Sequence, residues 1–264
     1  MRLSDLPFRL GTTSYIIPDD ILPNARYLVG KVRDIQLVLF ELDDQSNLPD
    51  HRVIDELNEL AHCHDLTYSV HLPLDLRLAA IGEGTHISMV KARRVMESTR
   101  DLNPVAYVVH LDGKEERLSS DPAVLSPWRD QAVKSLREAA GYCRDIRQIA
   151  VENLEGYPPE FNDAVIRTAG CSRCIDIGHL WLDGLDPISY LKDRLEETTI
   201  MHVHGIGKRD HESLQLVARE KMDELIQFLV EKKYKGIFTL EIFSESDLET
   251  SIEVIENSVA RLRG

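Results

Sequence analysis

The 264-residue sequence contains few cysteines, few aromatic residues and no long hydrophobic run. Four cysteines (Cys63, Cys143, Cys171 and Cys174) are too few to hold together a disulfide-based scaffold of this length. No stretch approaches the ~18 uninterrupted apolar residues of a membrane span. The first residues also lack the apolar core of a signal peptide. We therefore expect a cytoplasmic protein that makes no contact with a membrane.

Three motifs of common enzyme classes are also missing. No G-x-G-x-x-G follows the first strand-like run, which argues against a dinucleotide-binding fold. The sequence has neither a P-loop nor the G-x-S-x-G turn of serine hydrolases. Chemistry based on a serine nucleophile or on a bound nucleoside triphosphate is therefore disfavoured.

Basic residues are in the minority. There are 31 lysines and arginines against 45 aspartates and glutamates, and the formal net charge is −14. Proteins hold nucleic-acid backbones mainly through lysine and arginine, so this balance disfavours nucleic acid as the main ligand. We expect a small-molecule substrate, and the sequence leaves the oligomeric state open.

Short β-branched runs alternate with longer amphipathic stretches along the whole chain, as expected of parallel βα units. Eight such units most simply close into a barrel, a fold that commonly takes roughly 250 residues. We predict an α/β protein, a (β/α)8 TIM barrel forming a single domain over residues 1–264, with an open doubly wound sheet as the alternative. The predicted strands are Phe8–Ser14, Ile35–Glu41, Thr67–Leu72, Val105–Leu111, Gln148–Leu154, Arg173–Ile177, Thr199–His204 and Ile237–Phe243.

Two helix starts carry recognisable capping patterns. Ser126 followed by Pro127 predicts an N-cap and a first helical residue. Ser246 with Glu249 has the spacing of a capping box, which predicts the start of the last helix.

Imidazoles and carboxylates gather where the predicted strands end. In a barrel of parallel strands these ends converge on one face, where the active site lies. Each residue alone has an ordinary structural explanation, but nitrogen and oxygen donors gathered at one face suit Zn²⁺, Mn²⁺ or a similar divalent ion. The set consists of His71, His110, Glu152, Asp176, His179, His202, His204, His211 and Glu241.

Two local patterns bear on this site. His202 and His204 lie two residues apart on one predicted strand, so both point into the barrel. One would bind an ion and the other would contact substrate or support the ligands. Cys171 and Cys174 form an isolated C-x-x-C, which we interpret as an ordinary entry into a strand, with redox or metal-binding roles as alternatives.

With this pattern the chain resembles the xylose isomerase-like barrels, which include sugar isomerases and epimerases and the endonuclease IV type of abasic-site enzymes. The resemblance implies a one-ion ligand set of Glu152, Asp176, His202 and Glu241. In the endonuclease IV branch two further ions are held, and the resemblance implies for them the ligands His71 and His110 with Glu152, and His179 with His211. That branch has an aspartate two residues before the last histidine, where this chain has Arg209, whereas Asp210 directly precedes His211.

A narrower resemblance is to the cobamide-remodelling phosphodiesterases, which hydrolyse the nucleotide loop of a vitamin B12-type corrinoid. Two segments carry it, Gly11–Pro18 and Val70–Leu76. It implies a cobamide as the phosphodiester substrate.

The extra histidines favour a hydrolase that cleaves a small-molecule phosphodiester with a metal-activated hydroxide, using one to three ions per chain. The predicted catalytic residues are Glu152, Glu241 and His204, and the predicted substrate-binding residues are Tyr15, Lys114, Lys208 and Arg209. One alternative is a sugar or sugar-phosphate isomerase or epimerase that uses one ion and two glutamates. The other is a catalytically silent barrel that only binds a metal or a ligand.

Overall fold

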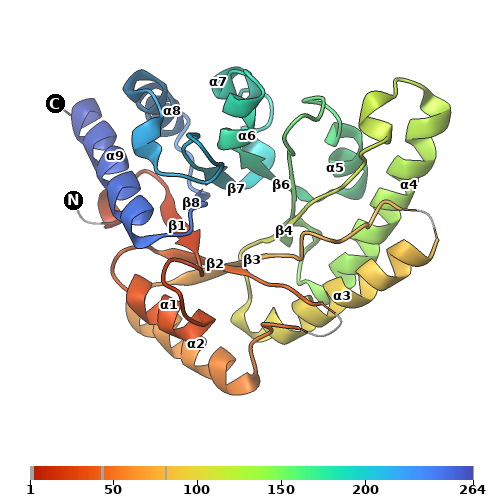
Figure 1. Cartoon of the computed structure of the whole chain (residues 1–264), viewed down its shortest axis with the longest axis horizontal. Helices are drawn as coiled ribbons and strands as arrows, with labels where there is room; N and C mark the ends of the chain where they lie inside the picture. Colours follow the sequence, from red (N-terminus) through yellow and green to blue (C-terminus); the bar gives the residue numbers. More distant parts are fainter. Residues whose placement is uncertain (1–2, 43–44, 81, 264) are drawn as a thin grey trace.

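The computed structural model describes residues 3–42, 45–80 and 82–263, and its strands form a closed ring (Figure 1). Neighbouring strands run parallel in the order of the sequence, and the first pairs with the last, with Arg9 opposite Ile237. The prediction of a (β/α)8 TIM barrel is confirmed. The strands are β1 (Arg9–Thr13), β2 (Asp34–Val38), β3 (Thr67–His71), β4 (Tyr107–Val109), β5 (Ile149–Glu152), β6 (Ser172–Asp176), β7 (Thr198–Val203) and β8 (Ile237–Leu240).

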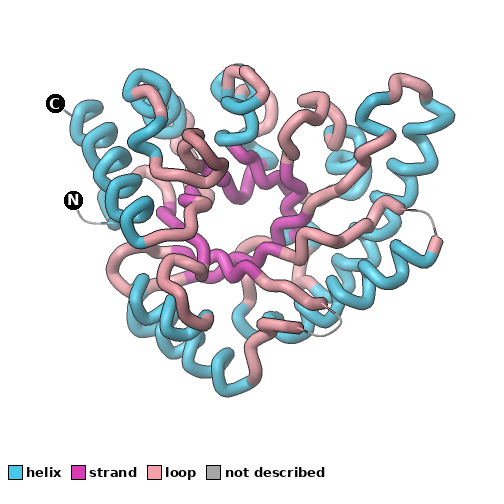
Figure 2. Tube along the Cα trace, in the orientation of Figure 1, coloured by secondary structure: helices cyan, strands magenta, loops and turns pink. Residues whose placement is uncertain are grey.

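Helices surround this ring on the outside (Figure 2). They are α1 (Ile21–Leu28), α2 (His51–His64), α3 (Glu83–Thr99), α4 (Pro122–Ala139), α5 (Asp163–Ala169), α6 (Ile177–Leu182), α7 (Pro187–Leu191), α8 (Arg219–Glu231) and α9 (Glu245–Arg263). Short 3-10 turns are η1 (Leu3–Asp5), η2 (Arg100–Leu102), η3 (Glu116–Leu118), η4 (Ala140–Tyr142), η5 (Ile146–Gln148), η6 (Leu195–Glu197) and η7 (Leu214–Leu216). None of the helices in the described part of the chain combines the length and the apolar character that a membrane crossing requires.

The hydrophobic core has two parts. The larger lies between strands and helices, and the smaller is a group inside the barrel that includes Val108, Ala150, Cys174 and Ile200. Successive side chains of a strand point to opposite faces, so the residue two positions further along each strand also points inward. These next inward positions are His110, Glu152, Asp176 and His202. The alternation of side chains along each strand therefore places apolar residues inside the barrel and polar residues at its carboxyl-terminal rim.

The predicted strands overlap the observed ones, but each observed strand ends one to three residues earlier. His110, His204 and Glu241 consequently lie just beyond β4, β7 and β8. A residue beyond the last ladder hydrogen bond can turn its side chain across the barrel mouth.

The predicted start of α4 after Ser126 is wrong. The helix begins at Pro122, with the Asp121 carboxylate accepting a hydrogen bond from the Ala123 amide at 2.8 Å. An acceptor followed by proline provides the same start earlier in the chain, and Pro127 lies within the helix.

The capping box predicted at Ser246 and Glu249 is also wrong. Ser244 is the acceptor at the start of α9, since its hydroxyl oxygen accepts a hydrogen bond from the Asp247 amide at 3.2 Å.

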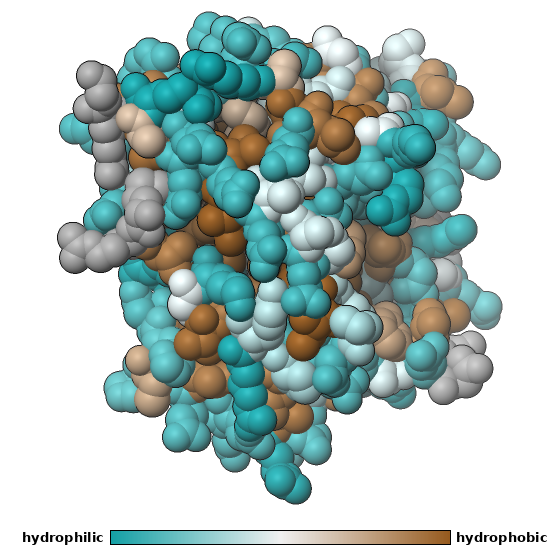
Figure 3. Space-filling view, turned by 60° about the vertical axis from the view of Figure 1, so that its left-hand side comes forward, coloured by the Kyte–Doolittle hydropathy of each residue, from teal (hydrophilic) through white to brown (hydrophobic). Residues whose placement is uncertain are grey.

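On the outer surface, Figure 3 shows mostly hydrophilic residues with small hydrophobic patches between them.

Candidate metal centre

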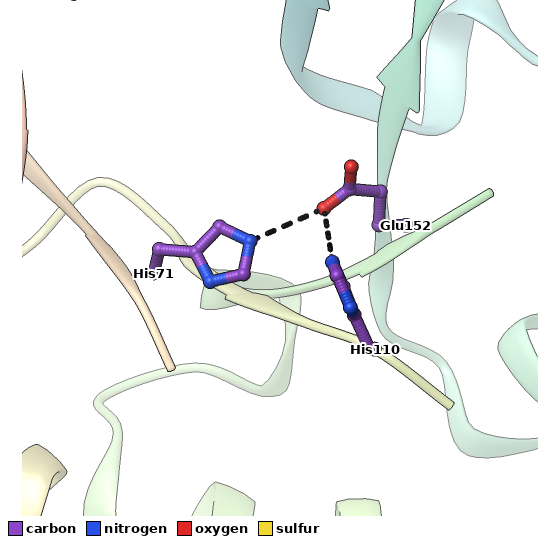
Figure 4. A group of neighbouring side chains, drawn as sticks. All are labelled: His71, His110 and Glu152. Carbon is purple, nitrogen blue, oxygen red and sulfur yellow. Dashed lines mark hydrogen bonds and ion pairs between the residues drawn. The ribbon is translucent and has the colours of Figure 1, made fainter. Parts of the chain in front are cut away.

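The rim of the barrel brings His71, His110 and Glu152 together (Figure 4). Glu152 ends β5, and its Oε2 lies 3.1 Å from Nε2 of His110 and 3.4 Å from Nε2 of His71. The other ring nitrogen of His71, Nδ1, donates to the Leu72 carbonyl oxygen at 2.8 Å. This bond leaves Nε2 as the ring nitrogen that faces Glu152 and that an ion would bind, the arrangement usual for a metal-ligating histidine.

A second group surrounds the other oxygen of the same carboxylate. Oε1 of Glu152 lies 3.3 Å from Nδ1 of His202, and that nitrogen lies 3.0 Å from Oε2 of Glu241 and 4.0 Å from Oδ2 of Asp176. All four residues are buried, and each offers a donor atom within 4.8 Å of the others. Glu152 is thus shared between two groups of donors.

The charges of these side chains balance one another without lysine or arginine. Burial by itself raises the pKa of the Glu152 carboxyl, but the neighbouring imidazoles of His202 and His110 outweigh it and hold that pKa well below its usual range. For His202 burial lowers the pKa, yet the neighbouring Cys174 sulfur and the carboxylates of Glu241 and Glu152 raise it well above its usual value. Protons on the histidines therefore balance the charge of the carboxylates in this cluster, as a cation would. A bound ion would displace these protons.

A third group lies beside the second and is built around Asp210. Its Oδ1 is 3.2 Å from Nδ1 of His204, and its Oδ2 is 3.5 Å from Nε2 of His211 and 4.0 Å from Nε2 of His179. The other ring nitrogen of His204, Nε2, lies 3.3 Å from Oδ1 of Asp176. Asp210 was absent from the predicted site residues, although its position next to His211 was a usable signal.

The local backbone is shaped to hold this third group. A Cβ atom on residue 178 would lie 2.1 Å from Cε1 of His204, so only glycine at the start of α6 leaves room for the ring. His211 has a φ of +57°, in the left-handed region that non-glycine residues seldom adopt. Such a conformation costs on the order of 1 kcal/mol or more and is typical of functional sites.

Several buried atoms in these groups have no hydrogen-bond partner among the described residues. They are Oδ2 of Asp176, Oε2 of Glu241, Nε2 of His204 and Nδ1 of His211. The 3.0 Å contact between Glu241 and His202 is close, but it lacks hydrogen-bond geometry at that oxygen. Unsatisfied buried acceptors are costly in an ordinary core, and a cation would satisfy them. The residues therefore fit divalent ions.

The predicted substrate-binding residues lie outside these groups. Lys114 is exposed and lies 3.7 Å from Asp112, and Arg209 is exposed and lies 3.5 Å from Glu212. Lys208 is exposed, and the hydroxyl of Tyr15 accepts a hydrogen bond from Asn47 at 3.2 Å. Their roles toward a substrate stay predictions.

The C-x-x-C pair has no partner cysteine pair in the described structure, and both thiols are free and buried. Burial raises the pKa of the Cys171 thiol to about 12 and that of Cys174 further. Cys174 lies inside the barrel below the rim and close to Glu152 and His202. Raised thiol pKa values favour the interpretation as ordinary strand residues over a redox role, whereas the position of Cys174 beside Glu152 and His202 leaves the metal-binding alternative open.

A closed parallel barrel with imidazoles and carboxylates at its carboxyl-terminal rim defines a class of fold with a candidate metal site. The family model described as "Xylose isomerase-like TIM barrel" matches residues 32–263. The chain belongs to this family. No curated protein sequence matches it.

Solved structures of similar fold include both epimerases and nucleases. A D-tagatose 3-epimerase-like protein is 19% identical, with a TM-score of 0.77 over 97% of this chain and 98% of the other. Endonuclease IV from Thermus thermophilus is 18% identical, with a TM-score of 0.72 over 96% of this chain and 99% of the other. D-psicose 3-epimerase from Clostridium cellulolyticum is 11% identical, with a TM-score of 0.71 over 97% and 98%. These structural similarities establish the fold. The reaction has to be inferred from the residues of the site.

Proposed function

We propose that the protein is a divalent-metal-dependent hydrolase that cleaves a small-molecule phosphodiester. One observation carries the proposal: the two oxygens of Glu152 face two different groups of donors. A carboxylate in this position is suited to bridge two ions. Zn²⁺ and Mn²⁺ both suit mixed imidazole and carboxylate ligands.

The ions would activate a water molecule and offset the charge on the phosphodiester oxygens. The chain's own contribution is to hold them. His71 and His110 with Glu152 would hold one ion, and Asp176, His202 and Glu241 with Glu152 would hold the next. Because these side chains are mostly buried, their orientation is fixed before substrate binds.

The third group would hold a further ion. Asp210 supplies the carboxylate that the sequence lacks at position 209, and His204 adds an imidazole to His179 and His211. With both ring nitrogens beside carboxylates, His204 is better placed to bind or orient ligands than to move a proton on a substrate.

Charge and surface character favour a small molecule over a nucleic acid. The net charge is −14, and the exposed cations Lys114 and Arg209 each lie beside an acid. Large apolar side chains are exposed in the segments that follow β2, β3 and β4, namely Leu42, Leu74, Ile87 and Leu118. Leu42 and Ile87 line one surface pocket, which offers apolar contacts to a bulky, partly apolar ligand. A cobamide, to which the segments Gly11–Pro18 and Val70–Leu76 point, has this character.

The test is to count ions and to measure turnover on the same protein. We expect two or three ions per chain after loading with Zn²⁺ or Mn²⁺, and hydrolysis of bis(p-nitrophenyl) phosphate or of a cobamide. His71→Ala and His110→Ala should each lose one ion and most of the turnover, whereas His64→Ala, at an exposed position, should lose neither. A single ion, with no cleavage of any phosphodiester, would refute the proposal.

A sugar isomerase or epimerase is the second candidate. The group of Glu152, Asp176, His202 and Glu241 by itself would hold one ion between two glutamates, which suits proton transfer beside a carbonyl. Solvent deuterium entering a ketose or aldose, together with one ion per chain, would favour this reaction. Tight ligand binding without turnover of either substrate class would instead favour a silent binding barrel.

A further inference from the structure

One buried side chain contacts the imidazole of His202 at Nε2, its second ring nitrogen. Gln36 on β2 reaches across the barrel and places its Nε2 2.8 Å from Nε2 of His202. Both residues are fully buried. The carbonyl oxygen of the same amide, Oε1, is buried without a hydrogen-bond partner among the residues that the structure describes.

The nitrogen of His202 that faces Glu241 and Glu152 is Nδ1, so Nδ1 is the nitrogen that an ion would bind. The ring proton then lies on Nε2, the nitrogen beside Gln36. An amide NH2 group only donates, so of the two amide groups only the carbonyl oxygen, Oε1, can receive that proton.

Ligation by Nδ1 therefore requires the amide oxygen, and not the amino group, beside Nε2. A rotation of the Gln36 amide by half a turn would place Oε1 where the amino group now lies. The position of the amide would stay the same, and the carbonyl oxygen that now has no partner would gain one.

We propose that Gln36 is a positioning residue for the metal centre: it holds the His202 ring in place, and its amide turns over so that Oε1 accepts Nε2–H when Nδ1 binds an ion. This rests on the metal centre of the proposed function and adds a residue outside the ligand set. Loss of an outer partner of a ligating histidine typically weakens metal affinity about 10–100-fold.

The test uses Zn²⁺ and measures binding rather than turnover. We expect Gln36→Leu to bind the tightest Zn²⁺ about 10–100-fold more weakly in competition with a chelator, and Gln36→Glu, which retains an acceptor, to recover most of the loss. Thr239→Val is the matched control. Thr239 is opposite His202 in the β7–β8 register and is fully buried, and its hydroxyl has no hydrogen-bond partner in the described part of the chain. Its substitution should leave the affinity unchanged.

A second measurement reads the tautomer directly. Proton–nitrogen correlation spectra of the Zn²⁺-loaded protein should show the ring proton of His202 on Nε2, with the signals assigned by their absence from His202→Gln. A ring proton on Nδ1 in the Zn²⁺-loaded protein, or equal weakening by Gln36→Leu and Thr239→Val, would overturn the proposal. Tight Zn²⁺ binding without cleavage of any phosphodiester would refute the proposed function alone.

Discussion

The two ends of the barrel bury aspartates in different surroundings. At the amino-terminal end Asp34 is fully buried, and its two oxygens accept hydrogen bonds from Thr67 at 2.6 Å and Ser69 at 2.7 Å. At the carboxyl-terminal rim Asp176 is equally buried, yet its Oδ2 has no hydrogen-bond partner in the described structure. A buried acid is therefore not in itself a sign of a site. The sign is an acceptor that the protein leaves unsatisfied.

The partners of each acid explain this difference. Hydroxyl groups can rotate to suit a single carboxylate, so the cluster around Asp34 is complete without a ligand. At the rim, Glu152, Asp176 and Glu241 share imidazoles that would have to carry protons to balance them. Exchange of those protons for a divalent cation would complete the second cluster.

The largest effect should come from Glu152→Gln, which would remove the charge shared by two groups of donors. We expect the loss of at least one ion per chain and a fall in turnover beyond the ~100-fold that an outer partner costs. Metal analysis and phosphodiester hydrolysis measure both. Asp34→Asn is the counterpart at the other end and should keep its ions. Equal ion loss in both variants would remove the distinction between the two ends.

Asp210→Asn should have the next largest effect. Its carboxylate lies 3.2–4.0 Å from nitrogens of His204, His211 and His179, so its neutralisation should release the third ion and lower turnover about 10–100-fold. Arg209→Gln changes the preceding, 79%-exposed side chain and should keep the third ion. If Arg209→Gln released the ion and Asp210→Asn did not, the assignment of the third group would be wrong.

Gly178→Ala tests how tightly the rim is packed. The new Cβ would overlap the His204 ring, and overpacking of this kind costs about 1–3 kcal/mol of unfolding free energy. We expect a lower melting temperature and a lost ion. Gly141→Ala is the control, because a Cβ there meets nothing within 4 Å and the residue does not have a positive φ. An unchanged ion count in Gly178→Ala would show that His204 is dispensable for metal binding.

Most of the barrel could be predicted from the sequence, because the spacing and the length of the strand-like runs are sufficient for it. Strand-like runs at regular intervals predict eight βα units, and parallel strands place their carboxyl ends on one face. The rim residues His71 and Glu241 followed from that rule alone. Helix starts were less predictable: Asp121–Pro122 and Ser126–Pro127 offer equivalent signals, and tertiary packing decides between them.

What the sequence could not supply were contacts across the barrel. Gln36 has no motif that marks it, and only the closed ring brings its amide to His202. The position of Asp210 next to His211 was a signal in the sequence, but its contacts with His179 and His204 are evident only in the fold. Spacing along the chain places residues on a face, whereas pairing across the ring depends on the barrel closing.

The smallest effect on the metal centre is expected for Asp34, because its change should alter the stability of the fold alone. Burial raises its pKa to about 6, against 3.8 for the free side chain, and the hydrogen bonds from Thr67 and Ser69 only partly oppose this. Between these two pH values the folded state keeps a proton that the unfolded state has lost, so the unfolding free energy falls as pH rises through the window and levels off above it. The fall amounts to at most about 3 kcal/mol. Denaturant titrations of the wild type and Asp34→Asn between pH 4 and 7 measure it by difference. Parallel curves for the two proteins would mean that Asp34 is ionised throughout, and the two ends of the barrel would then differ less than their hydrogen bonds indicate.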